Sequence, residues 1–407
     1  MTDSSASAGY RAVPRSVWVL GFVSLFMDIS SEMIHGLLPV FLVTTLGASA
    51  ALLGVIEGVA EATTAITKIF SGTLSDWLGK RKALVVTGYA MAALTKPIFA
   101  LAGSPLEVFG ARFVDRIGKG VRDAPRDALI ADITPPEIRG AAYGLRQAID
   151  TVGAFVGPLI AIGLLMFVTD DVRNVFWLAI IPGTIAVVLL VVGVKEPAVP
   201  ERDGALRPRL TVARLKALDI GFWTVIGIGV VVTLARFSEA FLILRGQEVG
   251  IVLALIPAVL IVMNVVYALS AMPAGSLSDR IDRRTILAAA LIVLIAADVV
   301  LAYWDGIVGV MVGVALWGLH MGLSQGLLSA LVADVAPKDL RGTAFGVFSL
   351  ATGIALIAAS TLAGILWETS GSASTFLTGA GFSAVALFSV LWLVLRSSRQ
   401  ARREDPK

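Results

Sequence analysis

The chain contains no cysteine, and only two of its 407 residues are histidines, His35 and His320. Without cysteine, the chain cannot form disulfide bonds, thiol nucleophiles or cysteine-ligated metal sites. The sequence also has no metalloprotease pattern and no nucleophile motif. We therefore expect no enzymatic activity and no bound cofactor.

Charged residues are scarce as well. They make up 15% of the chain, whereas 57% is hydrophobic and the mean hydropathy is +0.86. This composition is too apolar for a soluble protein of this length, and an apolar stretch of about 20 residues crosses a bilayer as a helix. Polar segments divide the chain into twelve predicted membrane helices, at residues 16–46, 50–75, 82–104, 106–132, 140–168, 173–194, 217–246, 249–276, 284–304, 306–333, 342–368 and 374–396.

Two polar signatures occur twice in this apolar sequence. GTLSDWLGKRK begins at Gly72 and is repeated as GSLSDRIDRR from Gly275, and ADITPPEIRGAAYG from Ala131 is repeated as ADVAPKDLRGTAFG from Ala333. Signatures that recur at half the chain length indicate two copies of one membrane unit, a layout typical of secondary transporters. We expect an N-terminal six-helix bundle at 1–194, a cytoplasmic linker at 195–216 and a C-terminal six-helix bundle with a basic tail at 217–407.

The basic residues predict the orientation in the membrane. Most of the 33 lysines and arginines lie in the tails and in loops on one side, and only Arg173 and Arg245 lie on the other side. The positive-inside rule therefore places both termini in the cytoplasm. No cleavage pattern precedes the first helix, so we expect no signal peptide. Anionic lipid accounts for the basic loops, and the net charge of +3 requires no nucleic-acid partner.

The repeated loop signature resembles that of the major facilitator superfamily. The matching residues are Gly72, Asp76, Gly79, Arg81, Gly275, Asp279 and Arg284. Gly153, Gly157 and Pro158 resemble the motif that this superfamily's antiporters carry on the fifth helix. The segments DISSEMIHGLLPVFL and RIGKGVRDAPRDALIAD are similar to a prokaryotic subgroup known mainly as uncharacterised permeases. The resemblance implies twelve transmembrane helices in two pseudo-symmetric six-helix bundles, antiport by alternating access, and a monomer in a prokaryotic inner membrane.

The loop signature has a physical interpretation of its own. Asp76 and Arg81 can pair with each other or with neighbouring helix ends. Such a charge pair would form in one transport state and break in the other, which would make it a cytoplasmic gate. The alternative is a solvated loop that only enforces the topology.

The predicted helix 106–132 carries eight charges on one face. They are Arg112, Asp115, Arg116, Lys119, Arg122, Asp123, Arg126 and Asp127. A charge at mid-membrane costs roughly 2.5–3.5 kcal/mol, so this face must contact protein or water. Pairs within the helix, such as Asp115 with Lys119, are one solution. We expect a structural network from residue 122 onward, whereas the deeper Arg112, Arg116 and Lys119 either join it or bind an anionic group of a substrate.

Acidic side chains occupy one face of each of the first two predicted helices. Asp28, Glu32 and His35 share a face of the first, and Glu57 and Glu61 share a face of the second. Two carboxylates facing each other in a low-dielectric site cannot both ionise cheaply, so we favour these groups as proton carriers. Asp28, Glu32, His35 and Glu57 form an alternative divalent-metal site. A third interpretation is that the acids only neutralise the basic residues of helix 106–132.

Asp150 is either a second protonation site or a partner of Arg116 or Lys119. We expect Gly157 and Pro158 to bend their helix and to pack against a helix of the other half. The second half carries few charges, and its candidate substrate-binding residues are Asn264, Tyr267, Trp317, His320 and Gln325.

The favoured function is proton-coupled antiport that exports a small molecule. A carrier of an anion or of a divalent metal ion is the first alternative. A membrane sensor or assembly factor that transports nothing is an alternative of another class. Unpaired acids near the midplane favour transport, whereas a fully paired charge lattice without a cavity favours the sensor.

Overall fold

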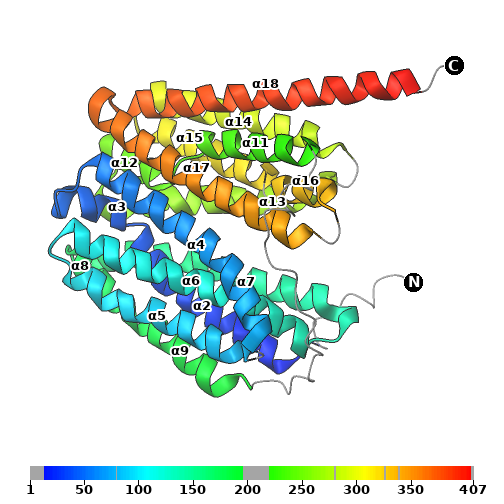
Figure 1. Cartoon of the computed structure of the whole chain (residues 1–407). Coiled ribbons are helices and arrows are strands. Elements are labelled where there is room, and N and C mark those ends of the chain that lie inside the picture. Colours follow the sequence, from blue (N-terminus) through cyan, green and yellow to red (C-terminus); the bar gives the residue numbers. More distant parts are fainter. Residues whose placement is uncertain are drawn as a thin grey trace, which may run out of the picture. The chain divides into compact units, whose positions relative to one another are not determined.

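The computed structural model describes residues 13–78, 80–195, 220–278, 281–324, 327–337 and 340–404. All regular secondary structure within these residues is helical (Figure 1). The elements are α2 Arg15–His35, α3 Leu38–Val40, η1 Phe41–Thr45, α4 Ala50–Leu78, α5 Arg81–Leu101, α6 Pro105–Ile133, η2 Pro136–Ile138, α7 Arg139–Phe167, α8 Val172–Leu178, α9 Ile180–Gly193, α11 Ile220–Ala235, α12 Ala240–Glu248, η3 Leu253–Leu255, α13 Ala258–Ser278, α14 Arg283–Tyr303, α15 Ile307–Ser324, α16 Leu327–Val335, α17 Arg341–Ser370 and α18 Ser372–Glu404. From residue 196 onward the predicted linker lies outside the described residues.

The predicted all-α membrane fold is confirmed. Eleven helical segments in the described part of the chain are long and apolar enough to cross a membrane. The remaining predicted span corresponds to α6, which has 29 residues but is too charged to be recognised by composition. Helix occupies each of the twelve predicted ranges.

Several of the predicted spans are interrupted. α2 ends at His35, and the chain resumes as the short α3, where Pro39 occupies the first turn because it has no backbone N–H to leave unsatisfied. Residues 236–239 separate α11 from α12. In this break the backbone N–H of Ser238 donates to Oγ of Ser360 at 3.2 Å, which satisfies a donor that the helix does not.

The chain divides into two compact units. Unit 1 comprises residues 1–47, 63–207 and 253–258, and unit 2 comprises residues 48–62, 208–252 and 259–407. The first part of α4 therefore belongs to unit 2 and the rest to unit 1. We describe each unit by itself.

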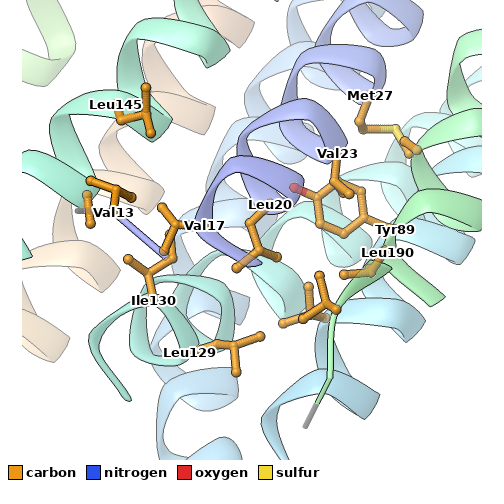
Figure 2. Packing of buried hydrophobic residues seen from close by; sticks show 14 of the residues in the cluster. Val13, Val17, Leu20, Val23, Met27, Tyr89, Leu129, Ile130, Leu145 and Leu190 are labelled. Atoms are coloured by element: carbon orange, nitrogen blue, oxygen red, sulfur yellow. The ribbon is translucent and has the colours of Figure 1, made fainter. Parts of the chain in front are cut away.

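Unit 1 is built around α2, which packs against α7 and α9, while α5 packs against α6 (Figure 1). One side of α2 carries Val17, Leu20, Val23 and Met27, which contact apolar side chains of α5, α6, α7 and α9 (Figure 2). This hydrophobic cluster ends at Met27, one residue before Asp28. The acidic residues of α2 thus begin just beyond this cluster.

Glycine allows the closest helix contact in this unit. A Cβ at Gly88 of α5 would lie 2.5 Å from the backbone oxygen of Gly118 of α6, and a Cβ at Gly118 would lie 2.7 Å from that of Gly88. In a bilayer, lipid solvates apolar side chains as well as protein does, so close packing and polar contacts hold helices together. The Gly88–Gly118 contact therefore fixes how α5 and α6 face each other.

Unit 2 has α14 in close contact with α15 and α18. Its interior contains an aromatic cluster in which the ring of Phe237 lies 5.3 Å from Trp317, 5.6 Å from Phe241 and 5.7 Å from Phe376. Pairs at such distances stabilise beyond their burial alone. The interior of unit 2 therefore contains an aromatic cluster.

Candidate functional site

A small polar pocket of about 20 Å³ lies between α2 and α6 of unit 1. Nine side chains line it: Asp28, Ser31, Glu32, His35, Arg112, Asp115, Arg116, Lys119 and Arg122. The structure therefore brings together six of the residues that the sequence nominated from separate helices. It adds Ser31, Asp115 and Arg122, which the sequence had not assigned to a cavity.

The acidic side chains of α2 each have a nearby partner. The His35 Nδ1 atom lies 3.5 Å from Oε2 of Glu32, one turn earlier on the same helix. The carboxyl group of Asp28 lies beside that of Asp150 on α7. Asp150 in turn lies 3.6 Å from Nη1 of Arg146. Asp150 therefore does not pair with Arg116 or Lys119 as one expectation had it, because it faces α2.

The helix motif of α7 positions these acids. A Cβ at Gly153 would lie 3.1 Å from the Cβ of Asp28, and a Cβ at Gly157 would lie 2.9 Å from the Cβ of Glu32. These glycines face α2, and their lack of side chains lets α2 approach closely. The motif thus supports the acidic face of the pocket.

The basic side chains come from one face of α6. Arg112, Arg116 and Arg122 are buried, and Lys119 is half-buried. Asp115 does not pair with Lys119, one turn along, as the sequence suggested. Its Oδ1 atom lies 3.1 Å from Nζ of Lys96 on α5. A pairing argument restricted to one helix could not include this partner.

Lys96 lies behind the pocket, where it contacts two of the lining side chains, and sequence reasoning missed it. Only 1% of it is exposed, and its Nζ donates to Oγ of Ser31 as well as to Asp115, both at 3.1 Å. The sequence alone could have indicated Lys96, because it is the one charged residue in the apolar stretch of α5 between Lys82 and Leu101. An ionisable residue within a membrane helix is by default a functional or paired group.

A network of aromatic and charged groups closes the pocket toward the hydrophobic cluster. The guanidinium of Arg122 lies over the ring of Tyr89, 4.5 Å from its centroid. Nη1 of Arg126 donates to the Tyr89 hydroxyl and to Oγ of Ser24, both at 3.4 Å, and Nη2 lies 3.6 Å from Asp123. From residue 122 onward, the charged side chains of α6 thus contact other protein groups, as a structural network would.

A divalent-metal site is not formed in the described part of the chain. No group of three or more histidine, cysteine, aspartate and glutamate side chains there could hold a metal ion. The four-residue site considered from the sequence, with Asp28, Glu32, His35 and Glu57, is therefore not assembled. Glu57 and Glu61 lie in the part of α4 that belongs to unit 2, whereas Asp28 and Glu32 lie in unit 1.

A charged pocket on apolar membrane helices fits the expected family, and the sequence matches it. The family model described as Major Facilitator Superfamily matches residues 20–243 and 225–407. The chain belongs to the major facilitator superfamily. It is 32% identical over 390 residues to an uncharacterized MFS-type transporter of Methanocaldococcus jannaschii, a match that covers 94% of this chain and 95% of that protein. It is 27% identical over 429 residues to the inner membrane transport protein YajR of Escherichia coli, covering 98% and 85%.

Solved structures of this superfamily share the fold. A peptide transporter superposes with a TM-score of 0.77 at 14% identity, covering 95% of each chain. The nucleoside transporter NupG superposes with a TM-score of 0.75 at 13% identity, covering 94% of this chain and 99% of that one. At such identities the likeness concerns the fold alone. The protein is thus an integral membrane transporter and not an enzyme, and transporters of this superfamily bind small molecules and act as monomers.

In this superfamily member the two repeated signatures contact each other. In unit 1, Nε of Arg81 lies 2.8 Å from Oδ2 of Asp132, so the first signature pairs with the second. In unit 2, Nη1 of Arg283 lies 2.7 Å from Oδ2 of Asp334, the counterpart of Asp132. In the alignment of the two repeats, Arg284 is the counterpart of Arg81. The arginine that pairs with Asp334 therefore lies one position before the expected one.

The remaining loop residues are described only in part. Gly72 faces α6 without close packing, since a Cβ at this position would be in ordinary van der Waals contact with the Cβ of Ala124, at 3.5 Å. The backbone N–H of Arg284 donates to Oδ1 of Asp282 at 2.8 Å, which caps α14. Gly275 is exposed near the end of α13. Gly79, Asp279 and the side chain of Asp76 lie outside the described part of the transporter.

The candidates in unit 2 are differently placed. Trp317 and His320 have no exposed surface, and Nδ1 of His320 is hydrogen-bonded to the backbone oxygen of Ala290 at 2.8 Å. Both therefore belong to the core of unit 2 in this structure, not to an open surface. Asn264 and Tyr267 are half-buried on α13. Gln325 lies outside the described residues.

Proposed function

We propose that the protein is a proton-coupled secondary transporter that moves a small molecule by alternating access. The observation that carries this proposal is the contact between the carboxyl groups of Asp28 and Asp150 at the edge of the pocket. Two carboxylates side by side in a low-dielectric site cannot both ionise cheaply, so such a pair favours holding a proton. Acids in this position within a membrane domain are candidate proton carriers.

The surroundings of this pair link the proton to the pocket. Lys119 and Arg122 of α6 face Asp28, Glu32 lies one turn further along α2, and Arg146 contacts Asp150. When the proton leaves, the new negative charge is attracted to the cations of α6. Protonation therefore changes the charge that the pocket presents to a substrate, and a difference of this kind can bias a conformational equilibrium.

The membrane setting is part of the proposal. We propose that residues 1–194 and 217–407 are the two halves that rock about the substrate, joined by a cytoplasmic linker at 195–216. The pair of Arg81 and Asp132 would act as a gate, formed in one state and broken in the other. Both termini would lie in the cytoplasm of a prokaryotic cell, with the protein in the inner membrane.

Two modes of coupling are candidates. Export in exchange for protons is favoured by the resemblance of the α7 motif to that of antiporters. It is also favoured by the multidrug resistance protein MdtH of Yersinia enterocolitica, which is 32% identical over 39% of this chain and 36% of that protein. Transport of an anion together with protons is favoured by the excess of cations that line the pocket.

Everted membrane vesicles test the coupling. Respiration acidifies their interior, and a quenched acridine dye reports the gradient while candidate substrates are added to the cytoplasmic face. Exchange would dissipate the gradient when a substrate is added, and Asp28→Asn and Asp150→Asn should abolish that response. Asp334→Asn, which removes an acid of a surface pair in unit 2, should not. If the Asp28→Asn Asp150→Asn double variant moves protons at the wild-type rate, this pair is not the coupling site.

A further inference from the structure

We propose that Asp298 of α14 is a proton-binding site of unit 2, and that its proton holds the end of α11 in place. The inference goes beyond the proposed function, because it stands whether or not Asp28 and Asp150 carry the coupled proton. Three observations support it: the burial of an acid without a partner, its position at the end of a broken helix, and the small residue that makes room for both.

Asp298 is buried without a partner. It has no exposed surface, and neither of its carboxyl oxygens has a hydrogen-bond partner in the described part of the chain. Burying an unpaired carboxylate costs far more than burying the protonated acid. Asp298 is therefore neutral in this structure and carries a proton. An ionisable residue inside a membrane helix is by default a functional group.

Within the described part of unit 2, no charged side chain is hydrogen-bonded to Asp298. α11 has no charged residue, and α18 has none between Ser372 and Trp392. His320 is the titratable residue of α15, and its Nδ1 atom is hydrogen-bonded to the backbone oxygen of Ala290, about two turns before Asp298 on α14. The other charged or titratable side chains of the surrounding elements are Arg283, Arg284 and Tyr303 of α14, Asp334 of α16, and Arg236 and Glu239 between α11 and α12.

Asp298 lies beside the break between α11 and α12. A Cβ at Gly379 of α18 would lie 2.9 Å from Oδ2 of Asp298 and 3.3 Å from the backbone oxygen of Ala235, the last residue of α11. The same Cβ would lie 3.0 Å from Cε1 of Phe237, which is within the break. Gly379 thus makes room where the carboxyl group and the end of α11 come together.

The two protonation states of Asp298 should act oppositely on this helix end. The last carbonyl groups of a helix carry its partial negative charge. A protonated carboxyl group can donate its O–H to such a carbonyl oxygen, which has two lone pairs. A carboxylate is repelled by the same oxygen. Loss of the proton to water should therefore loosen the end of α11 and the break that follows it.

A broken helix is a suitable place for such a site. In transporters, the carbonyl ends of half-helices at such breaks coordinate coupling ions, protons included. Phe237 also belongs to the aromatic cluster with Trp317 and Phe376, which keeps water from this part of unit 2. The proton can exchange with water only when the break opens. Proton exchange is thus tied to a conformational change.

Infrared spectroscopy of the purified full-length chain tests whether Asp298 carries a proton. A protonated carboxylic acid in an apolar site has a carbonyl stretch separate from those of amides and carboxylates. At neutral pH, the difference between the wild type and Asp298→Asn should contain this band, and Asp28→Asn Asp150→Asn should retain it. Asp334→Asn removes an exposed acid of unit 2 and should leave it unchanged. Asparagine is neutral and has the same shape, so Asp298→Asn should melt at about the wild-type temperature.

Two glycines of α18 provide matched variants that keep Asp298 itself. Gly379→Ala places a methyl group against the carboxyl group and should shift the band. Gly381→Ala adds the same methyl group where a Cβ would meet nothing within 4 Å, so it should not. This comparison tests the assignment even if Asp298→Asn does not fold.

A single thiol reports on the end of α11. Because the chain contains no cysteine, Thr233→Cys introduces a unique thiol in the last turn of this helix. Its rate of reaction with a maleimide is compared with and without Asp298→Asn, so the ionisation of the thiol itself cancels. Toward alkaline pH, the rate should become at least about 3-fold higher with Asp298 than with asparagine, because only the acid can lose its proton.

The outcomes separate this site from the proposed function. Identical infrared spectra of the wild type and Asp298→Asn, or no shift in Gly379→Ala, would overturn the assignment of a proton to Asp298. Equal reaction rates of the thiol at every pH would overturn its effect on α11. The band of Asp298 without proton movement in vesicles would leave this site standing and remove the proposed coupling. Proton movement that depends on Asp28 and Asp150, without that band, would do the reverse.

Discussion

Lys96 of α5 and Asp115 of α6 form a buried ion pair, with Nζ 3.1 Å from Oδ1. The side chains are only 2% and 9% exposed. The pair lies behind the pocket, where the Gly88–Gly118 contact has brought the two helices together. It neutralises a lysine that the apolar sequence of α5 would otherwise leave alone in the membrane domain.

Removing one partner of this pair should be much worse than removing both. Lys96→Met leaves Asp115 without its counter-ion, and we expect a loss of about 3–5 kcal/mol in the free energy of unfolding. Asp115→Leu should cost a similar amount. The double variant Lys96→Met Asp115→Leu should recover most of the loss, because no buried charge is left unpaired. Denaturant unfolding in detergent, followed by tryptophan fluorescence, measures the three values. A double variant less stable than either single would contradict this account.

Tyr89 offers a second test, because its ring and its hydroxyl have different partners. Tyr89→Phe keeps the ring beneath Arg122 but removes hydrogen bonds to Ser24 and Arg126, which should cost about 1–2 kcal/mol. Tyr89→Leu also removes the cation–π contact, worth about 0.5–2 kcal/mol, and leaves a cavity. The same unfolding assay should rank the wild type above Tyr89→Phe and Tyr89→Phe above Tyr89→Leu. Equal losses in both variants would mean that Arg122 gains nothing from the ring.

Hydropathy and periodicity were enough to predict the helices and the charged face of α6. Both depend on properties local to one segment: the length of an apolar run, and the angle between residues on one helix. The same reasoning also selected Asp28, Glu32 and His35, which the structure places in one pocket with Arg112, Arg116 and Lys119.

Partners on other helices could not be predicted in this way. Asp115 was matched with Lys119 because they are one turn apart, but Lys96 on α5 lies closer. Gly157 was expected to contact the other half, but it faces Glu32. Which faces meet depends on how helices rotate and approach, and that is set by many weak contacts at once.

The two signature pairs should differ in strength. Arg81 is 9% exposed and Asp132 26%, whereas Arg283 and Asp334 are 36% and 57% exposed. Solvent screens the second pair more, so Arg283→Gln should change stability by less than about 1 kcal/mol. Arg81→Glu should be clearly destabilising, and Arg81→Glu Asp132→Arg should restore part of the loss by reversing the charges. Unfolding curves of these three variants and the wild type decide the matter, and no recovery in the swapped variant would count against a direct pair.

Gly157 and Gly163 of α7 provide a test of how the acidic face is held. A Cβ at Gly157 would lie 2.8 Å from the backbone oxygen of Ile29 and 2.9 Å from the Cβ of Glu32, whereas a Cβ at Gly163 would meet nothing within 4 Å. Gly157→Ala should therefore push α2 away from α7 and cost about 1–3 kcal/mol.

Gly163→Ala is the matched control on the same helix. It adds the same methyl group and the same gain in helix propensity, so its stability should equal or exceed that of the wild type by up to about 1 kcal/mol. Equal stability of the two variants in the same unfolding assay would mean that α2 and α7 are not held as closely as the structure describes.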